Sequence, residues 1–375
     1  MSADQPATRQ TTDDQGKAAV HEPYNVSPGD YKGYLQEARN HDRDLWENNG
    51  WGIRSIEGEH DTLIWTSPYH FRSRPQKGPF AFEEASILQT MVVDVHYTKE
   101  QKRQMNDNDF YLTGWNGVED LRPPGDLQIR SEEDRTVWEI GGMTYEAAPP
   151  VWKVHGKDRA IDYDFTFRAN APAIWMTDPA KSAVETGDRW HMIYVDAEGK
   201  LGTPDRTIPV SGMAWHERHV HLSTTYDPAS LLKGRGLVIH NAFSRDFQVF
   251  FLARPDLGVY RAKVISPGGL VDFFGESEIK MTVDQHWTDP RSRFEIPCVW
   301  TIELENAQGK LSLHVTGFAR SYYLWNNLRR GVNVLYWWLA ESTGEWTDKR
   351  TQTTTAITEL KHVVHANRTF YHYSK

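Results

Sequence analysis

The sequence predicts an all-β protein in which strands joined by tight turns form sandwiches or barrels. Several segments alternate polar and apolar residues with a period of two, which is typical of half-buried strands. Turns rich in Gly, Pro and Asp separate these segments at short spacing. Aromatic residues favour strands, and the chain has 15 Trp, 16 Tyr and 15 Phe. With 375 residues the chain is longer than one typical domain, so we expect two domains or one large β-structure.

The N-terminal half holds a polar tail, the clearest alternating strand and two expected helices, of which the shorter one covers Lys99–Met105. Residues 1–23 are polar and rich in Gln, Thr and Asp, so we expect them to be disordered. A helix is expected over Tyr31–Asn48, where apolar residues fall roughly on one side. Asp162–Arg168 alternates strictly and places its three aromatic rings on one strand face. Trp190–Val195 predicts a strand that turns through Asp196–Lys200, where a glycine allows the bend.

Similar strand segments continue through the C-terminal half. They cover residues 247–253, 259–265, 298–304, 311–315, 332–339 and 351–358. A domain boundary is expected near Pro204–Ser211, where one set of strands ends and another begins. We therefore expect a first β-domain over residues 24–208 and a second over residues 209–375.

Composition argues against several classes of protein. The net charge is -9 and the basic residues form no cluster, so nucleic acid is not expected as a partner. No window has the ~18 apolar residues of a membrane span, and the N-terminus lacks the apolar core of a signal peptide. Cys298 is the single cysteine, which excludes an intrachain disulfide and fits a reducing, cytoplasmic location.

The segment Ser211–His221, SGMAWHERHVH, concentrates proton-handling groups beside an aromatic ring. If it is an extended strand, alternate side chains share a face. One face then presents Trp215, Glu217, His219 and His221. Such a row of aromatic and ionisable groups is suited to moving a proton beside an apolar substrate.

These residues predict an acid–base site. Glu217 or His219 would donate the proton, because a carboxyl in an apolar barrel has a raised pKa and works as an acid near neutral pH. The other residue, or Asp246 from a neighbouring strand, would orient water. The side chains expected to contact the substrate are Trp215, His221, Tyr336 and Trp337. The abundance of Trp, Tyr and Phe predicts an apolar or aromatic small-molecule substrate of medium to large size.

Two other interpretations of the same segment stay open. Glu217, His219 and His221 could together supply three ligands to a metal ion. The order His-Glu-Arg-His is not the HExxH motif of helical zinc proteases, so metal-free catalysis ranks above this reading. The other reading is a histidine-rich strand with hydrogen-bonded or solvated side chains and no chemical role.

Two passages resemble a known family of lipocalin-like proteins. Pro209–His219 is similar to the family pattern V-x-G-x-x-W-x-D-H-E-W, in which Trp215 matches the tryptophan. His286–Trp300, continued by Leu311–Val315, is similar to the family run W-x-S followed by Y-P-x-x-W-x-I. The family includes bacterial carotenoid 1,2-hydratase (hydroxyneurosporene synthase), fungal kievitone hydratase and related fungal Diels-Alderases. The resemblance covers the second half of the chain.

The chain departs from the family pattern at several positions. Glu217 stands where the family has Asp, and Arg218 and His219 replace its His and Glu. The carotenoid hydratases have a His two positions before the tryptophan, where this chain has Met213. The family's early Glu-Trp-Trp-Tyr signature is absent, and Asp61–Trp65 is the nearest segment. Because these differences lie at the expected site residues, they weaken the inference of the family's substrate more than the inference of its fold.

The resemblance implies two lipocalin-like antiparallel β-barrel domains packed together, with few short helices and no cofactor. It also implies hydration or dehydration of a C=C bond in a hydrophobic isoprenoid, polyene or aromatic molecule. A cyclase, isomerase or C–C lyase acting on a similar substrate is an alternative. A metal-dependent hydrolase that uses the histidine-rich strand, and a carrier of hydrophobic ligands, are two more, because a fold does not determine a function.

Overall fold

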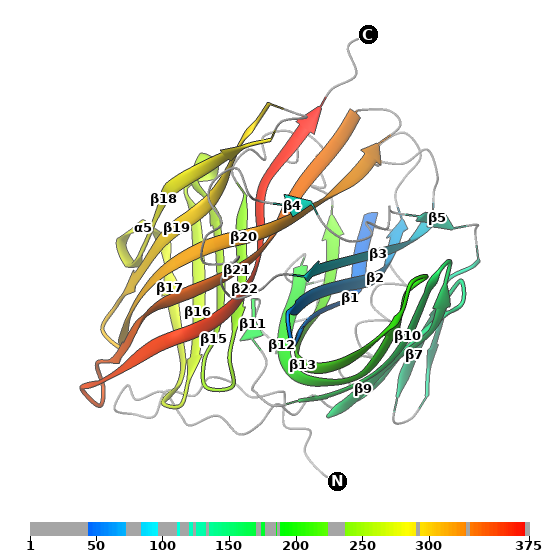
Figure 1. Cartoon of the computed structure of the whole chain (residues 1–375), viewed down its shortest axis with the longest axis horizontal. Coiled ribbons are helices and arrows are strands. Elements are labelled where there is room, and N and C mark those ends of the chain that lie inside the picture. Colours follow the sequence, from blue (N-terminus) through cyan, green and yellow to red (C-terminus); the bar gives the residue numbers. More distant parts are fainter. Residues whose placement is uncertain are drawn as a thin grey trace. The chain divides into compact units, whose positions relative to one another are not determined.

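The computed structural model describes residues 44–72, 84–96, 111–112, 120–122, 125–132, 135–169, 174–176, 185, 188–223, 237–289, 293–327 and 331–371. The expected disordered tail, residues 1–23, lies outside these residues. The chain divides into two compact units. The first unit contains residues 21–92 and 117–227, and the second contains residues 93–116 and 228–375. Each unit is built on a curled sheet (Figure 1), so the predicted all-β, lipocalin-like fold class is confirmed.

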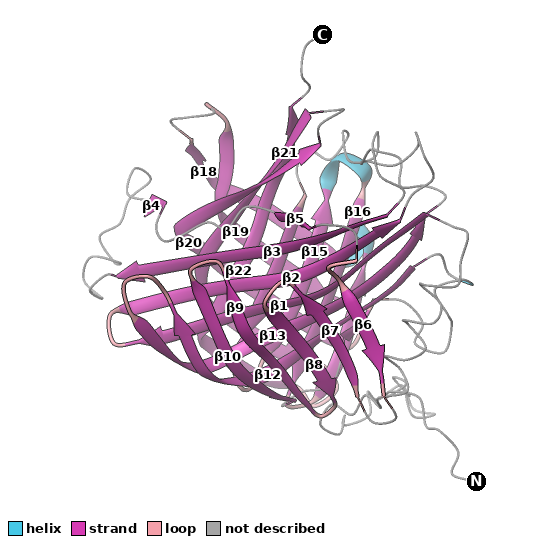
Figure 2. Cartoon of the chain, turned by 90° about the vertical axis from the view of Figure 1, so that its right-hand side faces the viewer, coloured by secondary structure: helices cyan, strands magenta, loops and turns pink. Residues whose placement is uncertain are grey.

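The first unit is built on a sheet of twelve strands. In their order across the sheet they are β5 (Asp120–Arg122), β3 (Glu84–His96), β2 (His60–Arg72), β1 (Asp44–Glu57), β13 (Thr207–Ser223), β12 (Asp188–Gly202), β10 (Ile161–Ala169), β9 (Val151–Asp158), β8 (Met143–Ala148), β7 (Thr136–Ile140) and β6 (Gln128–Ser131), with β11 (Ile174–Trp175) also paired to β12. Figure 2 shows the meander from β6 to β10 that leads into β12 and β13. The strand expected over 162–168 lies within β10, whose three aromatic rings are buried as predicted.

The hairpin expected after Trp190 turns later than predicted. β12 continues to Gly202, and the turn is closed by the amide N–H of Thr203, which donates to the carbonyl of Arg206 at 2.8 Å. Gly199 therefore lies inside the strand, with φ of 143°. A Cβ at this position would overlap the carbonyl oxygen of Asp164 on β10. The glycine is needed for close approach of two strands and not for the turn.

Two other expectations are corrected by strand pairing in the first unit. Asp44–Asn48 form a strand and not the end of a helix, because β1 pairs with β2 on one side and β13 on the other. The remaining part of that expected helix, residues 31–43, and the shorter expected helix, residues 99–105, lie outside the described residues. The boundary expected between residues 208 and 209 falls inside β13, which pairs with β12 from Thr207 onward. The first unit continues to Asp227 for this reason.

The second unit contains a sheet of ten strands. In order they are β17 (Gly269–Phe274), β16 (Val259–Ser266), β15 (Gln248–Arg254), β14 (Val238–Phe243), β22 (Thr353–Tyr371), β21 (Gly331–Asp348), β20 (Gly309–Asn327), β19 (Glu295–Glu305) and β18 (Ile279–Thr288), with β4 (Tyr111–Leu112) paired in parallel to β20. Short helical segments η1 (Pro255–Leu257) and α5 (Gly275–Glu278) connect some of these strands. None of the described helices is long and apolar enough to cross a membrane.

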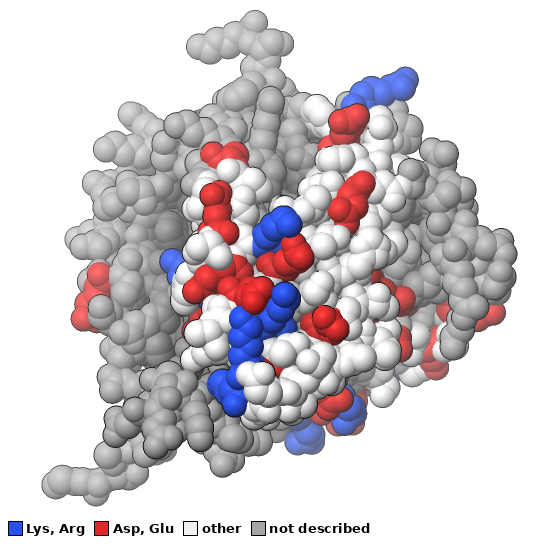
Figure 3. Space-filling model, turned by 90° about the vertical axis from the view of Figure 1, so that its left-hand side faces the viewer, with Lys and Arg blue, Asp and Glu red and all other residues white. Residues whose placement is uncertain are grey.

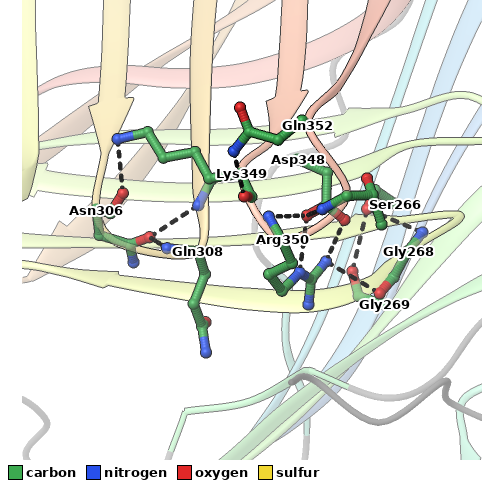
Figure 4. Close-up of polar contacts among 11 residues, drawn as sticks. Ser266, Gly268, Gly269, Asn306, Gln308, Asp348, Lys349, Arg350 and Gln352 are labelled. Carbon is green, nitrogen blue, oxygen red and sulfur yellow. Dashed lines mark hydrogen bonds and ion pairs between the residues drawn. The ribbon is translucent and has the colours of Figure 1, made fainter. Parts of the chain in front are cut away.

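Hydrogen bonds join three hairpin turns at one end of the second sheet (Figure 4). Arg350 donates through Nη2 to Asp348 Oδ2 at 2.6 Å and to the carbonyl of Gly268 at 3.0 Å. Lys349 donates to the carbonyl of Asn306 at 2.9 Å. The hydrogen bond from Arg350 lowers the pKa of Asp348. The turns after β16, β19 and β21 are thus held together by charge-assisted hydrogen bonds.

Charged side chains of both signs are interspersed on the face drawn in Figure 3. On the second sheet, Lys280 pairs with Glu303 at 3.0 Å, and Glu305 accepts from Lys349 at 2.7 Å. Lys310 also pairs with Glu305 at 3.2 Å. Exposed pairs of this kind contribute little to stability.

Candidate functional site

The segment 211–221 is extended, as predicted, and forms most of β13. Trp215 is fully buried, whereas Glu217 and His219 are half-buried. The backbone of His221 pairs with Trp46 of β1, but the side chain of His221 is outside those that the structure describes. We call the sheet surface that carries Trp215, Glu217 and His219 the Glu217 face.

Two glycines of β1 allow tryptophan rings to lie flat on the Glu217 face. Gly52 pairs with Trp215, and a Cβ on Gly52 would overlap the indole of Trp215. A Cβ on Gly50 would lie 2.5 Å from the indole of Trp65, which reaches over from β2. The two indoles are stacked with their centroids 6.0 Å apart. They form an aromatic surface next to the carboxyl-bearing position of β13, because Glu217 pairs with Gly50.

Gln89 of β3 orients this aromatic surface. Its Oε1 accepts hydrogen bonds from Trp65 Nε1 at 2.7 Å and from the hydroxyl of Tyr69 at 2.9 Å. All three residues are buried. The amide oxygen therefore fixes the edge of the Trp65 ring and satisfies two buried donors with one acceptor.

Asn48 of β1 connects the two ionisable groups of the Glu217 face. Its Nδ2 donates to Glu217 Oε1 at 3.2 Å, and its Oδ1 accepts from the backbone N–H of His219 at 3.1 Å. The His219 ring stacks on Trp190 of β12, with centroids 5.0 Å apart and planes 15° from parallel. Asn48 and Trp190 hold the two side chains in place along one strand.

Burial raises the pKa of Glu217, and it does so despite opposing effects of His219 and of the Asn48 hydrogen bond. A raised pKa means that the carboxyl keeps its proton at a pH where exposed glutamates have lost it. The Glu217 face thus combines a carboxyl whose pKa is raised, an imidazole and two indoles. This combination can deliver a proton to an apolar molecule and stabilise the positive charge that forms.

The opposite face of the same strands carries a paired set of charges. Arg218 Nη2 donates to Glu47 Oε2 at 2.6 Å, and Glu47 Oε1 is 2.8 Å from His70 Nδ1. Both Arg218 and Glu47 are fully buried. Burial would raise the pKa of Glu47, but the charge of Arg218 and the hydrogen bond of His70 lower it overall. We call this surface the Glu47 face.

Arg218 also joins the backbones of the two strands. Its Nη1 donates to the carbonyl oxygens of Asn48 at 3.0 Å and of His219 at 2.9 Å. Its guanidinium lies 5.2 Å from the ring centroid of Trp138. Arg218 therefore fixes the backbone of Asn48 and His219 from the opposite side of the sheet. The side chains of these two residues take part in the Glu217 face.

His216 belongs to the aromatic packing of the Glu47 face. It stacks on Trp51 at 4.2 Å, and Trp51 stacks on Phe167 of β10 at 4.0 Å. Burial lowers the pKa of His216 to about 3. The ring is neutral, so its Nδ1–H can donate to the carbonyl of Gly50, 3.0 Å away. This histidine packs within the first unit and is separated from the Glu217 face by the sheet.

Three predicted site residues lie in the second unit. Asp246 is exposed in the turn between β14 and β15, and not on a strand as expected. Tyr336 and Trp337 are buried neighbours on β21. The hydroxyl of Tyr336 donates to Asp289 Oδ2 at 2.6 Å, and the ring of Trp337 is tilted by 36° against that of His365, with centroids 3.7 Å apart. The structure brings Trp215, Glu217 and His219 together on one face of β13 in the first unit, whereas Asp246 belongs to the second unit.

The alternative metal set includes His221, whose side chain is not described. Among the described side chains, no group of three or more His, Cys, Asp or Glu residues is arranged to hold a metal ion. Glu217 and His219 form the part of that set that the structure shows, and two ligands are fewer than a tetrahedral zinc site uses.

Several of the residues that sequence reasoning missed come from one stretch of β1, Glu47–Gly52, or ENNGWG, and Trp65, Gln89 and Trp190 come from other strands. The β1 stretch supplies the carboxylate of the Glu47 face, the carboxamide that connects Glu217 with His219, and both glycines under the indoles. The sequence did contain one sign of this site, the glycines at 50 and 52 on either side of Trp51. A glycine inside a strand often marks a place where another group approaches the backbone closely.

Comparisons with known proteins identify relatives of the fold. The sequence matches no protein-family model and no curated protein sequence. A solved structure described as a candidate AttH from Nitrosomonas europaea is similar, with a TM-score of 0.55 and 10% identity over 87% of this chain and 92% of that chain. The crystal structure of CghA is similar with a TM-score of 0.53 and 10% identity over 88% of this chain and 90% of that chain. At such identities the likeness shows the fold, and it agrees with the lipocalin-like architecture of both units.

Proposed function

We propose that this protein is an acid–base enzyme that uses its own side chains, and no organic cofactor, to hydrate or dehydrate a C=C bond in a hydrophobic small molecule. The observation that carries the proposal is the half-buried Glu217 carboxyl, whose pKa is raised by burial next to stacked indoles. Carboxyls with this environment serve as general acids. The substrate class is an isoprenoid, polyene or aromatic compound, because its reacting carbon must lie against Trp65 and Trp215.

The reaction balances with the groups on the Glu217 face. Protonated Glu217 gives its proton to one alkene carbon, and the π electrons form the new C–H bond. The adjacent carbon becomes a cation, which the indole faces of Trp65 and Trp215 stabilise. Water adds to the cation, and its excess proton passes to His219 or back to Glu217. Dehydration follows the same steps in reverse.

A fold neighbour has been crystallised with a small molecule. A second CghA structure, with Sch210972, has a TM-score of 0.50 and 12% identity over 88% of this chain and 90% of that chain. We infer from the Glu217 face that this chain likewise takes a small molecule, with the aromatic surface as its contact. A cyclase, isomerase or C–C lyase would use the same proton donor, so the fate of water decides between these reactions and hydration.

The experiment is turnover of a panel of acyclic terpenes, polyenes and aryl alkenes in water enriched in oxygen-18. We expect one class to gain labelled hydroxyl. Glu217→Gln should lower the rate by about 100-fold or more, which is the usual contribution of a general acid. The matched control is Glu198→Gln, which changes an exposed glutamate on β12 and should leave turnover unaltered.

The outcomes separate the candidate functions. Full activity of both Glu217→Gln and His219→Ala would end the acid–base proposal. Conversion without incorporation of labelled oxygen would assign a cyclase, isomerase or lyase. Tight binding of a panel member that is always released unchanged would assign a carrier, and loss of turnover on chelation would assign metal-dependent chemistry.

A further inference from the structure

The apolar core of the second unit contains a small group of polar side chains from four strands. They are His240 on β14, Trp300 on β19, Ser342 on β21 and His362 on β22, and we call them the His240 cluster. All four are buried, and His240, Trp300 and His362 have no exposed surface. Buried aliphatic and aromatic side chains of the same sheet surround them.

The imidazole of His240 makes T-shaped contacts with three neighbouring rings. Its centroid is 5.5 Å from Phe251, 5.1 Å from Trp300 and 5.7 Å from His362, and all three pairs are close to perpendicular. Within the part of the chain that the structure describes, neither Nδ1 nor Nε2 of His240 has a hydrogen-bond partner. Buried polar groups in folded proteins are nearly always hydrogen-bonded, so two unpaired nitrogens on one ring need an explanation.

Trp300 adds another unpaired donor next to His240. Its Nε1–H is buried and has no partner among the described residues. The neighbouring pair is different, since Ser342 Oγ lies 2.7 Å from His362 Nε2. Ser342 and His362 thus share one hydrogen bond, whereas the polar atoms of the neighbouring His240 and Trp300 rings have no hydrogen-bond partner among the described residues.

The open groups define the chemistry of a ligand. A neutral imidazole has one N–H donor and one acceptor nitrogen, and an indole has one donor. Burial, together with the charge of His365, lowers the pKa of His240 to about 3, so the ring is neutral at physiological pH. Two neutral donors suit an uncharged oxygen with two lone pairs, and they would leave a carboxylate without a countercharge.

We propose that the core of the second unit binds a small uncharged molecule by its carbonyl or hydroxyl oxygen, which accepts hydrogen bonds from His240 and Trp300. This site lies in a different unit from the Glu217 face and does not depend on the proposed reaction. The aromatic rings of Phe251 and Trp300 would contact the apolar part of the molecule.

The test uses pairs of probes that differ only at the oxygen. Cyclopentanone and cyclohexanone are compared with methylenecyclopentane and methylenecyclohexane, in which a =CH2 group replaces the oxygen at nearly the same shape. Binding to the full chain labelled with ¹⁵N-histidine is followed by the shift of imidazole nitrogen signals. We expect a ketone to shift the His240 signal and to bind at least about fivefold more tightly than its hydrocarbon.

The variants remove one donor at a time. His240→Phe keeps an aromatic ring and removes both nitrogens, and we expect about tenfold weaker ketone binding. Trp300→Phe removes one N–H, and we expect about fivefold weaker binding. His155→Phe, which changes an exposed histidine on β9, is the matched control and should bind as the wild type does.

The proposal is overturned if every ketone binds no better than its hydrocarbon or if no probe moves the His240 signal. It is also overturned if His240→Phe and Trp300→Phe both bind the ketones as tightly as the wild type. Should His240→Phe fail to fold, as shown by its circular dichroism, the comparison of Trp300→Phe with the wild type decides alone.

Discussion

Glu47 and Glu217 lie on neighbouring strands of one sheet but face opposite sides, and the pKa values of their carboxyls are shifted in opposite directions. On the Glu47 face, Arg218 and His70 surround the carboxyl, and its pKa is lowered. On the Glu217 face the carboxyl accepts a hydrogen bond from the neutral amide of Asn48, and burial raises its pKa. The two side chains have the same chemistry, so the difference comes from whether a cation was buried with them.

This difference assigns two roles to two glutamates. A carboxylate paired with Arg218 is held ionised and contributes to joining β1 with β13. A carboxyl whose pKa is raised beside indoles holds its proton to a higher pH and is suited to donating it. Environments that separate the pKa values of two carboxyls are a common sign of an acid–base site. Each of the following changes acts on one face and leaves the other for comparison.

The largest effect is expected from Arg218→Ala. This change leaves the Glu47 carboxylate buried without its cation, which costs about 3–5 kcal/mol of unfolding free energy. Urea denaturation at neutral pH measures it. Arg168→Ala, an exposed arginine on β10, is the control and should change stability by less than about 0.5 kcal/mol. A loss below about 1 kcal/mol for Arg218→Ala would show that the charge pair is not important to the sheet.

A smaller effect is expected on the Glu217 face from Gly52→Ala. The added methyl overlaps the indole of Trp215, so we expect a loss of about 1–3 kcal/mol from overpacking and a displaced ring. The double variant Gly52→Ala, Trp215→Ala tests the cause. If the steric explanation holds, Gly52→Ala costs much less in the Trp215→Ala background than in the wild type, and equal costs in the two backgrounds would reject it.

Sequence patterns predicted the Glu217 face better than the Glu47 face. Alternation along residues 215–219 placed Trp215, Glu217 and His219 correctly, because side-chain direction in a strand depends only on local geometry. Glu47 was hidden because residues 31–48 have a helical pattern, which pairing of β1 on both edges overrides. Asn48 and Glu47, which accept hydrogen bonds from Arg218, are 170 and 171 residues away in sequence, and no local pattern encodes such contacts.

The fold shows the same division between local and distant information. The strand at 162–168 was predicted because its alternation is strict and its aromatic side is buried. The domain boundary was misplaced because Pro204–Ser211 looks like a linker. Only its first three residues, 204–206, lie in the turn, and β13 begins at Thr207. Asp246 was assigned to the site by composition alone, and the turn that carries it is exposed.

The pH dependence of stability should respond to Glu217→Gln. Because the folded pKa of Glu217 is raised, the native state holds its proton after the unfolded chain has lost it. The contribution of Glu217 to wild-type stability is therefore lost as the pH rises above about 4.5 through the folded pKa. Glutamine cannot ionise, so the variant should gain stability relative to the wild type from acid to neutral pH. Denaturation series at several pH values measure the difference, and a constant difference would contradict the raised pKa.

The smallest effect is expected from Trp190→Phe. The change keeps an aromatic ring under His219 but reduces the stacked area, so we expect a stability loss of no more than about 1.5 kcal/mol. The informative readout is the NMR signal of the His219 ring, which should shift because of the altered ring current. An unchanged signal would show that the stack does not hold this imidazole in solution.

The most direct test of the account is an infrared titration of the protonated carboxyl band, with the wild type compared with Glu217→Gln and Glu198→Gln. We expect one carboxyl band to persist in the wild type and in Glu198→Gln after the exposed glutamates have ionised, and to be missing from Glu217→Gln. If all three proteins lose their carboxyl bands together, Glu217 is an ordinary ionised glutamate and the proposed acid does not exist.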